Sequence, residues 1–70
     1  MCLSAVYDIS GGKERLICEH TTSISLDDGV ITITDILGDE ITITGVLKSI
    51  DLVKNTVMVE IPSISVYNME

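Results

Sequence analysis

Residues 30–45 decide the fold, and they read VITITDILGDEITITG. The tetrapeptide Ile-Thr-Ile-Thr occurs twice in this stretch, with Gly38-Asp39 between the two copies. Apolar and polar residues that alternate with a period of two are typical of a strand with one buried face. Glycine and aspartate favour a tight turn between two such strands. The stretch therefore predicts a β-hairpin with its isoleucines towards the core and its threonines towards water.

Short runs rich in β-branched residues continue on both sides of this hairpin. No segment carries the helical period of 3.6 residues, and turn residues such as Gly11-Gly12 and Lys54-Asn55 separate the runs. About five to seven short strands with turns every 8–12 residues indicate an all-β fold, either a small barrel or a sandwich. We predict strands at 3–9, 14–20, 24–26, 30–35, 40–44, 46–53 and 56–61.

Pro62 ends the last predicted strand, because proline cannot donate to a sheet ladder. We expect one domain over residues 1–62 and a C-terminal extension over residues 63–70. The extension is too apolar for a solvated linker, so it either adds a strand to its own domain or packs across a second subunit. The chain has 70 residues and neither Trp nor Phe, so its core is thin. A bound metal or a second copy would support such a core.

The charge balance is strongly acidic. Eleven Asp and Glu against four Lys and Arg give a formal net charge of −7. Nucleic acid is disfavoured, because phosphate contacts require clustered basic residues and these four are scattered along the chain. An acidic surface suits cations or a basic protein patch. No apolar run approaches the ~20 residues of a membrane span, and the N-terminus does not resemble a signal peptide, so we predict a cytoplasmic protein.

Most motifs that carry chemistry are missing from the sequence. There is no phosphate-binding loop, dinucleotide fingerprint, nucleophile elbow or Cys-x-x-Cys, and the chain has a single histidine. We therefore predict that the protein is not an enzyme.

Cys2 is the exception, because it stands beside the amino terminus. The Met1 amine, the Cys2 amide and the Cys2 thiolate can close two adjoining five-membered chelate rings. If Met1 is removed, the Cys2 amine and thiolate close one ring, and the Leu3 amide lies close by. Nitrogen and thiolate donors in a plane suit Ni(II) or Cu(II), although Zn(II) or Cu(I) could also take the thiolate. A symmetric dimer would add a second Cys2 and complete the site.

Two other groups of residues have simpler explanations than a metal site. Cys18 and His20 stand two apart and should project from the same face of a strand, where they could form part of a metal site. Such a pair is more often a packed thiol beside a partly exposed imidazole, which is the interpretation we favour. Acidic residues next to Gly29 and Gly38 are explained by turn preference, and the spacing of a calcium loop is absent. These acidic residues are Asp27, Asp28, Asp39 and Glu40.

The opening Met-Cys-Leu-Ser-Ala-Val-Tyr, residues 1–7, resembles the start of the CooT family of small nickel-binding proteins. The resemblance continues through the acidic hairpin at 30–45 and Ile-Asp-Leu at 50–52. It implies an SH3-like small barrel, a homodimer, and Ni(II) held by Cys2 for maturation of carbon monoxide dehydrogenase. The resemblance transfers Cys2 alone, whereas Met1 and Leu3 enter by the chelate argument.

The sequence thus predicts a Ni(II)-binding accessory protein that acts as a nickel chaperone, store or sensor. Its expected partners are the nickel ion, a second copy of the chain, and carbon monoxide dehydrogenase or its maturation proteins. The alternative is a small β-barrel that binds a protein or an RNA without a metal. A thiol switch between Cys2 and Cys18 is a third possibility, which requires their Cα atoms to approach within ~7 Å.

Overall fold

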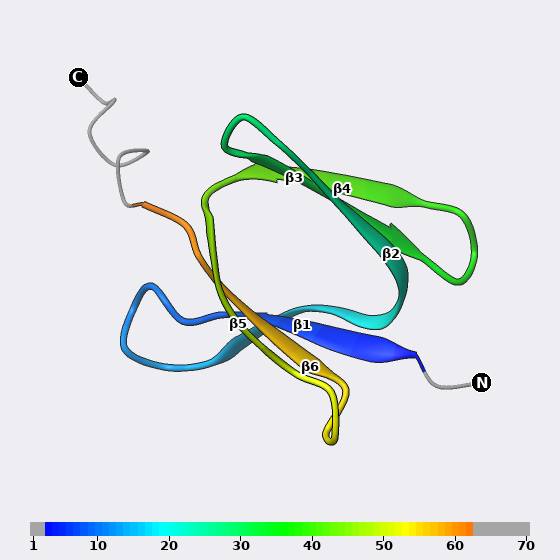
Figure 1. Ribbon diagram of the computed structural model, residues 1–70, viewed down its shortest axis with the longest axis horizontal. Coiled ribbons are helices and arrows are strands. Elements are labelled where there is room, and N and C mark those ends of the chain that lie inside the picture. The colour runs from blue at the N-terminus through cyan, green and yellow to red at the C-terminus, as the bar shows by residue number, and fades with distance from the viewer. Residues whose placement is uncertain (1–2, 63–70) are drawn as a thin grey trace.

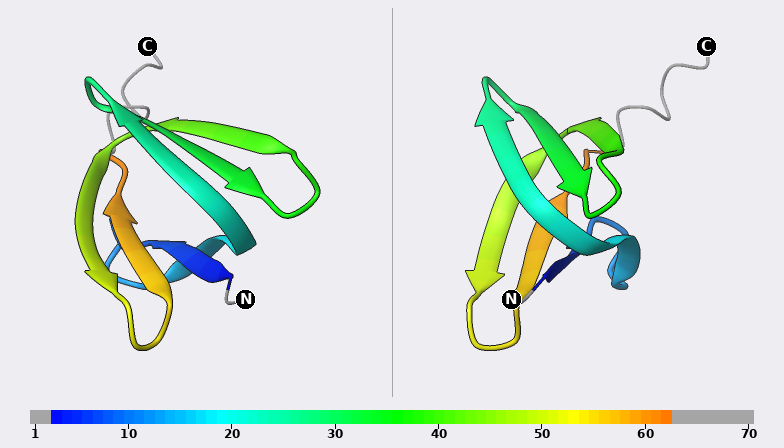
Figure 2. Two further views of the ribbon diagram at one scale, coloured as in Figure 1. Left: turned by 45° about the vertical axis from the view of Figure 1, so that its right-hand side comes forward. Right: turned by 90° about the vertical axis from the view of Figure 1, so that its right-hand side faces the viewer.

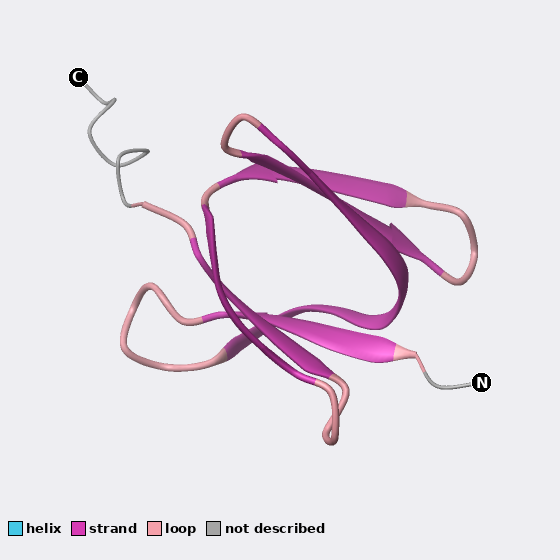
Figure 3. Cartoon of the chain, viewed as in Figure 1, coloured by secondary structure: helices cyan, strands magenta, loops and turns pink. Residues whose placement is uncertain are grey.

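The computed structural model describes residues 3–62, which form one six-stranded sheet (Figure 1). Residues 3–62 contain no helix, and so none that could cross a membrane (Figure 3). The predicted extension at 63–70 lies outside the described residues. The strands are β1 (Ser4–Asp8), β2 (Arg15–Asp27), β3 (Val30–Asp35), β4 (Glu40–Thr44), β5 (Val46–Asp51) and β6 (Thr56–Glu60).

The strands lie in the order β4-β3-β2-β1-β6-β5. Every neighbouring pair is antiparallel except β1 and β6, which are parallel. The sheet bends strongly, so that its two outer hairpins face each other across the molecule (Figure 1). The predicted all-β class and the predicted number of strands are confirmed, and the arrangement is compatible with an SH3-like barrel.

The central hairpin has the predicted register. Ile31 pairs with Ile43 and Ile33 with Ile41, so the four isoleucines share the inner face. Ile31 and Ile33 are fully buried, and Ile41 and Ile43 are half-buried. The threonines of β4 are exposed, as expected for the outer face. Val6, Cys18, Val57 and Val59 complete the core.

The prediction of two separate strands at 14–20 and 24–26 is wrong, because both belong to β2. The polar residues Thr21, Thr22 and Ser23 do not break the chain into two elements, because β2 continues through them as one 13-residue strand. Its pairing shifts twice against β1 and once against β3. Each such bulge adds an unpaired residue and bends the strand. Strand β2 can therefore pair with β1 at one end and with β3 at the other.

Gly45 makes the corner between β4 and β5. Its amide donates to the Gly29 carbonyl at 3.0 Å. A Cβ atom at this position would lie 2.6 Å from the Glu60 carbonyl oxygen, so only glycine fits without a shift of the backbone. Strand β5 ends at Asp51, two residues before the predicted end at Val53, because the Asp51 carboxylate starts a turn there.

Candidate functional site

The predicted metal site lies at the beginning of the chain. Met1 and Cys2 are outside the described residues, and Leu3 is half-buried just before β1. The first residues of β1 are held from both sides, since Ser4 pairs with Thr21 and Ala5 with Thr56. The Ala5 amide also donates to the Asn55 carbonyl at 2.9 Å. Leu3 is thus anchored to a central strand at one end of the sheet.

The β3–β4 turn stands on one side of this end. The Ile36 amide donates to the His20 carbonyl at 2.9 Å, which ties the turn to β2. The Asp35 carboxylate accepts hydrogen bonds from the amides of Leu37 at 2.8 Å and Asp39 at 3.0 Å. An aspartate that binds the backbone ahead of it in this way rigidifies a turn. The turn leaves Ile36 exposed and the Leu37 side chain 82% exposed.

The β5–β6 turn stands on the other side and is built in the same way. The Asp51 carboxylate accepts hydrogen bonds from the amides of Val53 and Lys54, each at 3.0 Å. These two donors, Lys54 first, hold the pKa of Asp51 below its usual value, because they stabilise the charged form. Leu52 and Val53 project from the turn with 81% and 91% of their surfaces exposed.

Thr21, next to Ser4 in the sheet, is buried, yet its hydroxyl has no hydrogen-bond partner among residues 3–62. Cys18 is packed in the core, whereas His20 is exposed, because the bulge between Cys18 and Thr21 interrupts the alternation of β2. The packed thiol is thus confirmed, but the expected common face of Cys18 and His20 is not found. No three His, Cys, Asp or Glu side chains form a metal-binding cluster within residues 3–62.

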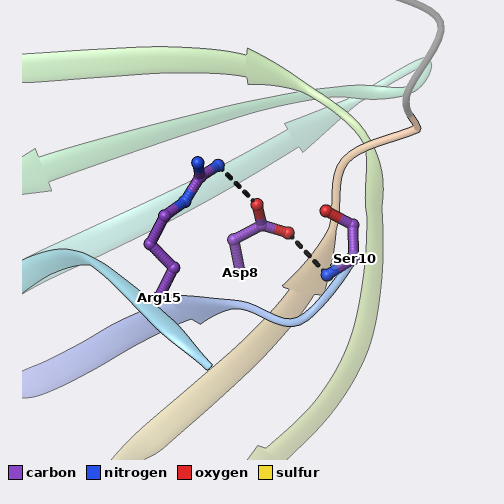
Figure 4. Close-up of polar contacts among 3 residues, drawn as sticks. All are labelled: Asp8, Ser10 and Arg15. Carbon is purple, nitrogen blue, oxygen red and sulfur yellow. Dashed lines mark hydrogen bonds and ion pairs between the residues drawn. The ribbon is translucent and has the colours of Figure 1, made fainter. Parts of the chain in front are cut away.

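The opposite end of β1 carries a polar cluster that the sequence did not predict (Figure 4). Asp8 is buried, and its carboxylate accepts hydrogen bonds from the Ser10 amide at 2.9 Å and the Arg15 guanidinium at 2.7 Å. The Ser10 amide contributes most to holding the pKa of Asp8 below its usual value, and Arg15 adds to it. Lys13 and Gly11 join these residues around a cavity of about 250 Å³. Lys13 and Arg15 thus line the same cavity in the structure, although the four basic residues form no run in the sequence.

The fold defines a small, strongly bent six-stranded β-protein with its candidate ligands at the amino terminus. A family model described as "CO dehydrogenase accessory protein CooT" matches residues 1–60. The chain therefore belongs to the CooT family, whose members are accessory proteins of carbon monoxide dehydrogenase and not enzymes themselves.

A solved structure agrees with this assignment at the level of the fold. The chain is similar to the crystal structure of a protein assigned as CooT from Carboxydothermus hydrogenoformans, with a TM-score of 0.79 and 21% sequence identity. The match covers 87% of this chain and 98% of that one. No curated protein matches the sequence. Residues 61–70 lie beyond the family match.

Proposed function

We propose that this protein binds Ni(II) through the Cys2 thiolate and nearby backbone nitrogens of Met1, Cys2 and Leu3. In this role it would carry, store or sense nickel for carbon monoxide dehydrogenase. The observation that carries the proposal is the position of Cys2, two residues before a strand that is hydrogen-bonded on both sides. Membership in a family of carbon monoxide dehydrogenase accessory proteins supports it.

The chemistry of the donors favours nickel over harder metals. Thiolate and deprotonated amide nitrogen are strong donors in one plane, the geometry that Ni(II) adopts, whereas Mg(II) and Ca(II) require oxygen ligands. The pairings of Ser4 and Ala5 hold the start of β1, next to Leu3, in a defined place in the sheet. The surrounding charge of −7 also attracts a divalent cation.

A homodimer is part of the proposal. One chain supplies two or three donors, and a second Cys2 across a twofold axis would supply more. We expect one nickel ion for two chains in that case. A reducing cytoplasm would keep the thiols available, and the net negative charge would keep nucleic acid away.

Calorimetric titration of the reduced protein with Ni(II) tests the proposal. We expect saturable binding that is lost in Cys2→Ser. The second cysteine provides the matched control, because Cys18 is buried in the core and Cys18→Ala should bind nickel as the parent does. Nickel binding that survives Cys2→Ser, or that disappears in Cys18→Ala while the fold is retained, would overturn the assignment.

A further inference from the structure

Strand β1 begins between two turns that each present aliphatic side chains to solvent. The end of β3 lies two strands from the start of β1 on one side, and the end of β5 lies two strands from it on the other. Neighbouring strands are about 4.8 Å apart, so each turn begins about 10 Å from the start of β1. Figure 2 (left) shows the blue β1 between the green β3–β4 turn and the yellow β5–β6 turn.

The exposed side chains are held in place by the turns. Aspartate carboxylates brace both turns through backbone amides, and neither turn is stabilised by burial of its own apolar residues. Keeping four large aliphatic side chains in water forgoes the stabilisation that their burial would give. Exposed apolar side chains on both flanks of one strand end can form one interaction surface. We call the four residues Ile36, Leu37, Leu52 and Val53 the terminal rim.

We propose that the terminal rim is a docking surface for a partner protein that presents an apolar depression bordered by Lys and Arg. The proposal rests on the proposed function, because the partner would be the protein that exchanges nickel at Cys2. Charge supports a basic border: the two turns carry four carboxylates and one ammonium group, a formal net charge of −3. Complementary charge speeds and orients docking. The charged residues are Asp35, Asp39, Glu40, Asp51 and Lys54.

The same charges argue against a second copy of this chain as the occupant. Two terminal rims placed face to face would bring two groups of net −3 together, and like charges across an interface disfavour association. The proposed homodimer requires the two Cys2 residues to meet, and it does not require the rim of one chain to contact the rim of the other. The rim can thus remain free for another protein.

Binding to purified, nickel-free carbon monoxide dehydrogenase from the same organism tests the proposal. The variant Leu37→Asn/Leu52→Asn removes one apolar side chain from each turn. The matched control is Leu16→Asn/Leu26→Asn, at two exposed leucines of β2. Leu16 pairs with Tyr7 near the end of β1 and Leu26 with Ile31 near the start of β3, so both lie away from the rim. We expect the rim variant to bind at least tenfold more weakly, and the control to bind as the parent does.

Two further measurements use the same materials. Raising the salt from about 0.05 to 0.5 M should weaken binding of the parent, because screening acts on exposed charges. Asp39→Lys should slow association several-fold. Absence of binding by the parent, or equal loss in the rim and control variants, would overturn the proposal. A rim variant that turns a dimer into a monomer would also overturn it, because the rim would then be a contact between copies.

Nickel titration of the same variants separates this proposal from the proposed function. The rim variant should bind Ni(II) as the parent does. Docking that is lost while nickel binding is unchanged supports the rim. If the parent protein binds nickel but does not dock, the docking proposal alone is refuted. If the parent docks but does not bind nickel, the nickel assignment alone is refuted.

Discussion

Replacing Gly45 by alanine should destabilise the fold more than any other single-methyl addition at a glycine. The added Cβ would lie 2.6 Å from the Glu60 carbonyl oxygen and 3.4 Å from two further backbone atoms. Carbon and oxygen normally approach to about 3.3 Å, so one backbone segment must move by roughly 0.7 Å. Glu60 belongs to β6, which is paired with both β1 and β5 and cannot move freely.

Overpacking of this kind typically costs about 1 to 3 kcal/mol. A chain of this length has a total stability of about 3 to 10 kcal/mol, so the loss should be a large fraction of it. The melting temperature should fall by about 4 to 8 °C for each kcal/mol. Urea unfolding of the metal-free protein, followed by far-ultraviolet circular dichroism, measures the change without the added stability of a ligand.

Gly11→Ala is the control for this substitution. A Cβ at Gly11 meets no atom within 4 Å, and its φ is not positive, so the variant should unfold within about 0.5 kcal/mol of the parent. If Gly45→Ala proves as stable as Gly11→Ala, the close approach of the β4–β5 corner to β6 is wrong.

Three further predictions concern the core, the buried acid and the buried hydroxyl. Ile33→Ala should cost about 2 to 5 kcal/mol in urea unfolding because Ile33 is fully buried, whereas Ile50→Ala, at an exposed position, should cost far less. The pKa of Asp8 is lower in the folded state than in the unfolded state, so the unfolded state binds more protons in acid and Asp8 stabilises the fold above about pH 4. That contribution is lost as the pH falls through the folded pKa, and Asp8→Asn should therefore flatten the acid limb of a stability–pH curve; an unchanged limb would refute the role of Asp8. Thr21→Val should leave stability unchanged or raise it by up to about 1 kcal/mol, since it removes a buried hydroxyl without a partner among residues 3–62, and a clear loss would contradict this reading.

Local patterns were sufficient to predict the central hairpin. The alternation of Ile31 and Ile33 with threonines, and its repetition at Ile41 and Ile43, gives both the strand period and the buried face. The continuity of β2 could not be read in the same way. Its polar residues at 21–23 are typical of a loop, and they remain in a strand only because β1 and β3 pair with it on opposite sides.

The pairing of strands that are far apart in the chain could not be predicted from the sequence either. The parallel pairing of β1 with β6 joins the two ends of the described chain, and no local signal specifies it. The buried pair of Asp8 and Arg15 depends on the hairpin at Gly11-Gly12, which brings together residues seven apart. An acid and a base placed symmetrically about a predicted tight turn are the signal that could have indicated this pair.

In the candidate site, too, some features follow from the local sequence and others only from the fold. The donors at Cys2 follow from chemistry at the chain start, which needs no fold. The terminal rim, in contrast, follows from four registers that place the ends of β3 and β5 around the start of β1. Leu52 and Val53 belong to the strand predicted at 46–53, and Ile36 directly follows the one predicted at 30–35. Only the aspartate-braced turns show that all three are exposed.

Nickel-edge X-ray absorption spectroscopy of the reduced, nickel-loaded protein identifies the atoms that bind the metal. We expect square-planar coordination by nitrogen and sulfur, and loss of the sulfur in Cys2→Ser but not in Cys18→Ala. A coordination shell that contains only oxygen and nitrogen in the parent, or sulfur that persists in Cys2→Ser, would contradict this expectation.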